Sequence, residues 1–186
     1  MFQTKIMNLF IFNTQYLNID YLNCGNMKIN KMEQGSPNKK NVLITSEKGS
    51  RDFCEFNEDS DAFVLKKVLS NSFPAYYGFI PKTHHIDAEP LDVLVLTNEP
   101  LRQGIVVQAR PIGLIRLRGK IPDDILIAVL LTEQPKDLLN LEREEIEKLK
   151  NFLEELKEKE VEDVFGTSHA MKSVEKAIEL YRREFE

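Results

Sequence analysis

The sequence predicts a mixed α+β domain, in which a small closed β-barrel carries two amphipathic C-terminal helices on its side. Short apolar segments separated by Pro, Gly, Asn and Asp fill residues 41–131 and predict strands. Because no long helical pattern lies between these segments, we expect antiparallel pairing, and a closed barrel is the simplest way to bury their side chains. After Pro135 the apolar residues recur at helical spacing instead.

Six apolar segments are expected to form strands. They are NVLIT (41–45), AFVLKKVL (62–69), YYGFIP (76–81), LDVLVL (91–96), GIVVQARPIGLIRL (104–117) and ILIAVLL (125–131). The polar turn EKGSRD follows the first segment. Their spacing and the turn-forming residues between them favour an all-antiparallel arrangement.

Two amphipathic helices are expected after the strands. The apolar positions of the first are Ile146, Leu149, Phe152, Leu153 and Leu156, and those of the second are Ala170, Met171, Val174, Ala177, Ile178 and Tyr181. Both sets recur every three or four residues, so each forms one apolar stripe on a helix. The charged residues between them are expected to form the solvent-facing sides.

Composition limits the classes of function. The chain has 186 residues, 42% of them hydrophobic and 30% charged, which suits one domain with a core. A net charge of -5 argues against a nucleic-acid binder that relies on general phosphate attraction. Cys24 and Cys54 lie far apart, with no metal or redox spacing, and are expected to be free thiols.

The first forty residues differ from the rest. They are rich in Asn and carry a balance of +3, whereas the remainder carries -8. The apolar patch IMNLFIF is too short to cross a bilayer, and no small-residue cleavage site follows it. We therefore expect residues 1–40 to be a tail, residues 41–186 to be a single domain, and the protein to be cytoplasmic.

The stretch HHIDAEPLDVLVL (84–96) crowds Asp87, Glu89 and Asp92 against a buried strand. Two carboxylates about 5 Å apart repel by roughly 3 kcal/mol at an effective dielectric of about 20. A fully solvated acidic turn would avoid this cost. The local pattern is therefore also compatible with an ordinary surface loop that has no functional role. Asp123 and Asp124 also precede an apolar strand.

Carboxylates gathered at strand ends favour a hard divalent cation. Mg²⁺ typically binds one or two carboxylates, several waters and a substrate phosphate. Lys66, Lys67, Lys82 and Lys157 could supply the positive charge that phosphoryl chemistry requires. Taken singly, each lysine is more typical of a solvated surface.

The segment FPAYYGFIPKTHHIDAEPLDVLVL resembles the core motif of the soluble family I inorganic pyrophosphatases. The flanking stretches NVLITSEKGSRDFCEFNEDSDAFVLKKVL, PLRQGIVVQARPIGLIRL and DDILIAV extend the likeness over residues 41–131 in one unbroken order. The resemblance implies an OB-like, five-stranded barrel with flanking helices, assembled into a homo-oligomer. It also implies hydrolysis of pyrophosphate with several Mg²⁺ ions, for which Mn²⁺ could substitute.

The same resemblance implies roles for the acidic residues. Asp87 and Asp92 would bridge the metal ions that activate water, and Glu89 would help to position or deprotonate that water. Asp123 would be a further metal ligand and Glu55 a peripheral acid.

The resemblance also implies three contacts to phosphate, by Tyr77, Lys157 and Lys67. Lys67 stands where the family has an arginine. It keeps the positive charge but loses the two-pronged grip of a guanidinium.

Several positions depart from the family pattern. An expected metal-binding glutamate falls at Thr45, a lysine at Phe53, a tyrosine at Leu156 and an asparagine at Tyr76. Residues 118–120, Arg-Gly-Lys, replace an expected acid. We therefore expect fewer bound metal ions and slower turnover than in relatives.

Three functions remain open from the sequence. Asp87, Asp92 and Asp123 favour a working inorganic diphosphatase. Thr45 and Phe53 instead favour a catalytically weak or inactive protein that binds a partner or a phosphate ligand. An OB-type nucleic-acid binder is disfavoured because the chain is acidic and lacks an aromatic stacking stripe. No membrane contact is expected.

Overall fold

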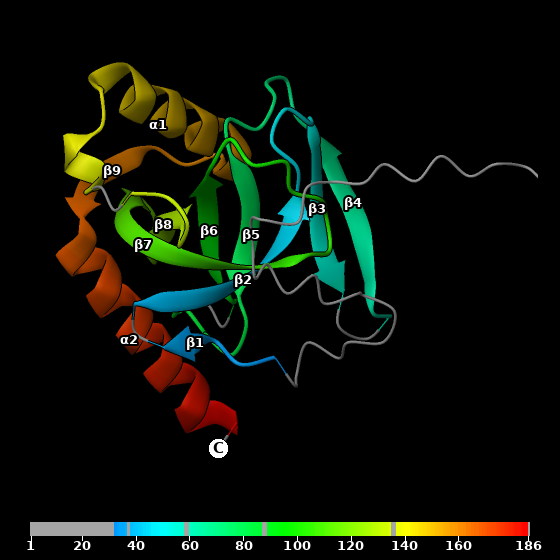
Figure 1. The fold of residues 1–186 in the computed structure, drawn as a ribbon, viewed down its shortest axis with the longest axis vertical. Coiled ribbons are helices and arrows are strands. Elements are labelled where there is room, and N and C mark those ends of the chain that lie inside the picture. The colour runs from blue at the N-terminus through cyan, green and yellow to red at the C-terminus, as the bar shows by residue number, and fades with distance from the viewer. Residues whose placement is uncertain (1–31, 37, 58–59, 87–88, 135–136, 186) are drawn as a thin grey trace, which may run out of the picture.

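The structure is a computed structural model that describes residues 32–36, 38–57, 60–86, 89–134 and 137–185 (Figure 1). Its elements are β1 (Gly35–Ser36), β2 (Lys39–Ser46), β3 (Asp52–Asn57), β4 (Ala62–Val68), β5 (Tyr76–Ile80), β6 (Leu91–Leu96), β7 (Val106–Leu117), β8 (Asp123–Leu130), the 3-10 turn Leu138–Asn140, α1 (Arg143–Lys157), β9 (Val161–Gly166) and α2 (Thr167–Phe185).

Five strands pair in a ring, which confirms the expected barrel. β2 pairs with β5, β5 with β6, β6 with β8, β8 with β7, and β7 returns to β2. Strand β7 closes this ring because residues 106–109 pair with β2 and residues 109–117 pair with β8, and the pairing with β8 contains a bulge between Pro111 and Gly113. At Gly78, β2 and β5 lie so close that an added Cβ would be 2.0 Å from the Leu43 carbonyl oxygen.

One pairing in the ring is not antiparallel as the sequence predicts. β6 and β8 run parallel, with Val93 opposite Leu126. The strand that precedes β8 in the chain, β7, pairs antiparallel with the opposite side of β8. β8 therefore returns beside β6 in the same direction as β6.

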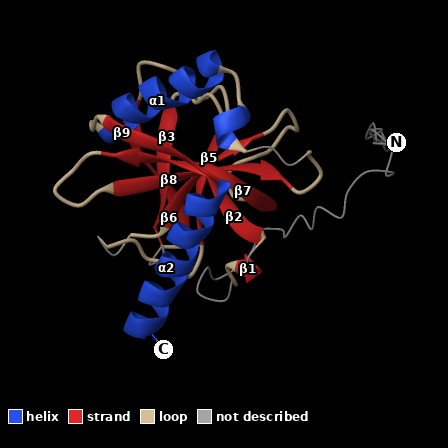
Figure 2. Cartoon of the chain, turned by 90° about the vertical axis from the view of Figure 1, so that its left-hand side faces the viewer, coloured by secondary structure: helices blue, strands red, loops and turns tan. Residues whose placement is uncertain are grey.

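The two expected helices are confirmed and cover two sides of the barrel (Figure 2). Helix α1 buries Leu149, Phe152, Leu153 and Leu156 in one core cluster. Helix α2 buries Ala170, Val174 and Ala177 in a second cluster, against barrel side chains. Neither described helix has an apolar stretch long enough to span a membrane.

The segment 62–69 was expected in the barrel but forms β4 of a separate hairpin. β4 pairs with β3, which the apolar pattern did not mark as a strand, and the two make their own two-stranded sheet. β9, also not expected, adds to the edge of β7. Both strands carry acidic residues at several positions, so their apolar alternation is weak.

The described fold begins before residue 41. Met32 is buried against Leu43 and Val106, and β1 pairs with β2. The rest of the expected tail, residues 1–31 with Cys24, lies outside the described residues.

Candidate active site

Two aspartates of the candidate site begin neighbouring strands. Asp92 is the second residue of β6 and Asp123 is the first residue of β8. Because β6 and β8 pair in parallel, their N-terminal ends lie at the same end of the barrel. The parallel pairing therefore brings together two carboxylates that are 31 positions apart in the sequence.

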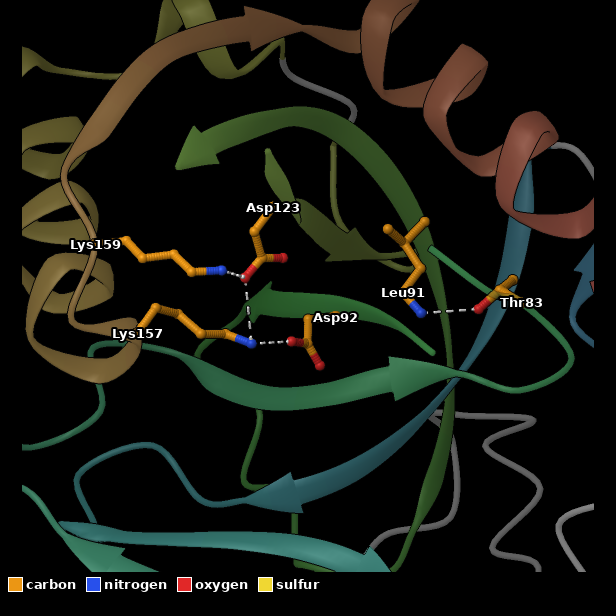
Figure 3. Close-up of polar contacts among 6 residues, drawn as sticks. All are labelled: Thr83, Leu91, Asp92, Asp123, Lys157 and Lys159. Atoms are coloured by element: carbon orange, nitrogen blue, oxygen red, sulfur yellow. Dashed lines mark hydrogen bonds and ion pairs between the residues drawn. The ribbon is translucent and has the colours of Figure 1, made fainter. Parts of the chain in front are cut away.

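Two lysines reach these carboxylates: Lys157, the last residue of α1, and Lys159, two residues after it (Figure 3). The Lys157 Nζ lies 2.5 Å from the Asp92 Oδ2 and 3.7 Å from the Asp123 Oδ2. The Lys159 Nζ lies 3.2 Å from that same Asp123 oxygen. The carboxylates converge as predicted, and lysine ammonium groups balance their charge.

The surroundings shift the pKa values of this pair. Burial alone would lower the pKa of Lys157, but the negative charges of Asp92, Asp123 and Glu89 outweigh it and raise that pKa. Burial raises the pKa of Asp92, and the opposing effect of Lys157 only partly offsets the rise. Lys157 is thus a firmly protonated cation beside a carboxylate that is more basic than usual.

A pocket of about 240 Å³ opens beside Asp92. Its walls come from β2, β3, β5, the start of β6 and the end of α1. The lining residues are Thr45, Phe53, Cys54, Glu55, Phe56, Tyr77, Phe79, Glu89, Pro90, Asp92 and Lys157. Five of the residues predicted for the site therefore share one cavity, with exposed Glu89 among them.

Tyr77 lies in the wall of this pocket with a buried hydroxyl. Among the described residues, that oxygen makes no hydrogen bond of ordinary geometry, although the Asp92 carboxylate lies close to it. Burial and the nearby charge of Asp92 raise the pKa of Tyr77 well above its ordinary value. The phenol therefore stays neutral and can donate a hydrogen bond to a bound anion.

Thr83 fixes the base of the acidic loop, and the sequence interpretation missed it. Its buried hydroxyl donates to the Ile80 carbonyl at 2.6 Å. The same hydroxyl accepts from the Leu91 N–H at 3.0 Å (Figure 3). It thereby joins the end of β5 to the start of β6 and positions Asp92. A lone threonine in a loop carries no sequence signal for this contact.

Other predicted site residues lie differently. Lys67 pairs with Glu158 at 3.0 Å and does not line the pocket. Glu55 lines the pocket and pairs with Lys66 at 3.0 Å. Asp87 lies outside the described residues.

Asp124 separates from Asp123 because consecutive strand residues face opposite sides. Its carboxylate accepts two hydrogen bonds from Arg116, at 2.6 and 2.9 Å, and one from the Ser173 hydroxyl at 3.0 Å. Asp124 thus supports the contact with α2, and only Asp123 joins the candidate site.

The donor set fits a divalent cation of the Mg²⁺ type. No group of three or more His, Cys, Asp and Glu side chains is placed to hold a metal within the described ranges. However, Mg²⁺ commonly takes only one or two protein carboxylates and fills its shell with water and phosphate. Asp92 and Asp123 converge on one cationic group, as such a site requires.

The profile of the inorganic pyrophosphatase family matches residues 42–186. The chain belongs to this family. It is 30% identical to the inorganic pyrophosphatase of Haloferax volcanii over 169 residues, which cover 83% of this chain and 96% of that protein. It is 32% identical to the Campylobacter jejuni inorganic pyrophosphatase, covering 84% of this chain and 100% of that protein.

Solved structures agree with this membership. The Thermus thermophilus inorganic pyrophosphatase superposes with a TM-score of 0.76 at 28% identity, over 84% of this chain and 99% of that one. The Neisseria gonorrhoeae enzyme gives a TM-score of 0.74 at 28% identity, over 83% and 98%. The resemblance seen in the sequence is confirmed across the domain.

Two departures from the family pattern place uncharged side chains, Thr45 and Phe53, in the pocket lining of this pyrophosphatase-family chain. Thr45, where a glutamate was expected, is buried and its hydroxyl donates to the Tyr77 carbonyl at 3.4 Å. Phe53, where a lysine was expected, packs edge-on against the Tyr77 ring at 5.7 Å. Leu156, where a tyrosine was expected, is buried in the core cluster under α1.

Replacing Lys157 by Met should lower the free energy of unfolding by about 1–3 kcal/mol, because Asp92 and Asp123 lose a partly buried partner. Mg²⁺ at about 100 times its dissociation constant should restore about 2.7 kcal/mol by binding only the folded protein. Urea unfolding with and without Mg²⁺ measures both effects. Equal stability of the variant and the original chain without Mg²⁺ would contradict the bridging role of Lys157.

Proposed function

We propose that this chain hydrolyses inorganic pyrophosphate to two phosphates with divalent metal ions, Mg²⁺ foremost and Mn²⁺ as a substitute. One observation carries the proposal. Asp92 and Asp123 converge on a single cation position beside a pocket that also presents Tyr77, Glu89 and Lys157. Family membership favours this function over partner binding alone and over nucleic-acid binding.

The aspartates would hold the metal. Asp92 and Asp123 are the described ligands, and Asp87 is added from the family resemblance. The bound ion supplies a water of lowered pKa and positive charge for the phosphate oxygens.

The remaining side chains would handle substrate and proton. Lys157 binds a phosphate oxygen as a fixed cation, and the neutral Tyr77 hydroxyl donates a hydrogen bond to another. Glu89, at the exposed side of the pocket, accepts the proton of the attacking water. Glu55 would add negative charge at the edge of the pocket. Lys67 would bind phosphate only after its ion pair with Glu158 is broken.

Three departures from the family pattern predict a slower enzyme. Glu89 is longer than the family aspartate by one methylene, and a misplacement of about 1 Å can reduce the rate on the order of 100-fold. The uncharged Thr45 and Phe53 remove a metal ligand and a phosphate contact that the resemblance predicts. We also propose a cytoplasmic homo-oligomer, on the basis of the resemblance.

Phosphate release from pyrophosphate tests the function. The full chain should release phosphate with Mg²⁺, more slowly or to a different extent with Mn²⁺, and not at all once EDTA removes the metal. Release that continues at the same rate in EDTA would contradict the metal-dependent reaction. No release with either metal would contradict the proposed function.

A further inference from the structure

Lys159 reaches the candidate site although the sequence interpretation gave it no role. Its Nζ lies 3.2 Å from the Asp123 Oδ2, the oxygen that the Lys157 Nζ approaches at 3.7 Å (Figure 3). The Asp123 side chain is 13% exposed and that of Lys159 is 35% exposed. The Lys159 ammonium therefore lies at the border between the aspartates and solvent.

The backbone holds Lys159 in this place. Glu158 adopts a left-handed conformation with φ of 55° and ends α1, which turns the chain back toward the barrel. On the C-terminal side of Lys159, the Glu160 carbonyl accepts a hydrogen bond from the Arg118 backbone N–H at 2.7 Å. The Val161 N–H donates to the Glu154 carboxylate at 2.8 Å. Contacts on both sides thus fix the direction of Lys159.

The other basic residues expected near the site are either paired elsewhere or replaced. Lys67, the predicted phosphate contact, is engaged by Glu158, and Phe53 replaces a second expected cation. Arg118, in the shortened loop, pairs with Glu160 at 3.4 Å. In the part of the chain that the structure describes, Lys157 and Lys159 are the cations in ion-pair contact with Asp92 and Asp123.

We propose that Lys159 is a second phosphate-binding lysine of this active site. In the metal-free protein it rests on Asp123. With a divalent cation held by that carboxylate, the Lys159 ammonium group would be repelled from Asp123 and would turn to an oxygen of the substrate. The two phosphoryl groups of pyrophosphate give Lys157 and Lys159 separate partners. This role rests on the proposed function and deepens it.

Steady-state kinetics with Mg²⁺ test the contact to substrate. Lys159→Met should raise KM for pyrophosphate about tenfold with kcat changed less than about twofold, because a charge-assisted hydrogen bond is lost. Lys159→Arg should restore most of the affinity. Lys150→Met is the matched control, since Lys150 lies on α1 and pairs with Glu147 on the surface. An unchanged KM in Lys159→Met would overturn the proposal.

Calorimetric titration of Mg²⁺ without substrate gives a second readout. Lys159→Met should bind Mg²⁺ about threefold more tightly, because a competing cation has left Asp123. Weaker Mg²⁺ binding would overturn the proposal, since it would mean that Lys159 only supports the carboxylate.

Binding of inorganic phosphate separates the two hypotheses. If the original chain releases no phosphate from pyrophosphate, the proposed function fails. Lys159 is then judged by the dissociation constant for phosphate in Mg²⁺, which Lys159→Met should raise about tenfold. An equal dissociation constant in the variant and the original chain would overturn the role of Lys159.

Discussion

Replacing Asp92 by Asn is expected to reduce phosphate release from magnesium pyrophosphate by about 10²–10⁴-fold. The substitution keeps the shape of the side chain but removes its charge. Asp92 lies 2.5 Å from Lys157 at the start of β6 and is one of two described carboxylates on the shared cation position. A metal would lose a ligand there, and Lys157 would lose the carboxylate that orients it.

The matched control is Asp52→Asn, at an exposed aspartate on β3 outside the pocket lining. It should release phosphate at the rate of the original chain. Asp92→Asn should still fold, which circular dichroism would check. If a folded Asp92→Asn protein kept more than about a tenth of the activity, Asp92 would not be a metal-binding residue of the reaction.

Replacing Asp124 by Ala is expected to lower the free energy of unfolding by about 1–3 kcal/mol, because charge-assisted hydrogen bonds are lost while the Arg116 side chain, which is 35% exposed, remains partly solvated. Asp124 is 5% exposed and holds Arg116 through two hydrogen bonds, with Ser173 as a third partner. The change leaves the Arg116 guanidinium without its carboxylate between β7 and α2. Urea unfolding measures the loss, with Asp52→Ala as the exposed control. A loss below about 1 kcal/mol would contradict the structural role.

The pH dependence of this loss has a definite sign. Burial alone would raise the pKa of Asp124, but the hydrogen bonds and charge of Arg116, with the Ser173 hydroxyl, lower it overall. Because the pKa of Asp124 is lowered in the folded state, its carboxylate stabilises the fold at pH values above the ordinary aspartate pKa of about 3.9. This stabilisation is lost as the pH falls through the pKa of the folded state. The difference between the original chain and Asp124→Ala should therefore be constant near neutral pH and shrink in acid.

Local periodicity was sufficient for much of the fold. The helical stripes of α1 and α2 and the apolar segments of β2, β5, β6, β7 and β8 could be predicted because each pattern lies within one element. The segment that became β4 has an equally apolar pattern, yet it pairs with β3 outside the barrel. Periodicity marks a strand and does not name its partner.

The site was predicted in its residue types and less well in its contacts. Asp92, Asp123 and Lys157 were proposed from the sequence and meet at one edge of the barrel. Lys67 was proposed on the same grounds, but Glu158 engages it instead. Lys159 was missed because its contact with Asp123 joins positions far apart in the chain. Thr83 was missed because its contacts, although local, follow no motif.

The sequence by itself determined the two classes of element, the acidic character of the site and the resemblance to the pyrophosphatase family. Only the tertiary structure decided that β6 and β8 run parallel, which brings the starts of both strands to one edge. It also decided that Asp123 faces the site whereas Asp124 faces α2. Strand direction and pairing depend on contacts between segments that are distant in the sequence. The pattern within any one segment therefore does not determine them.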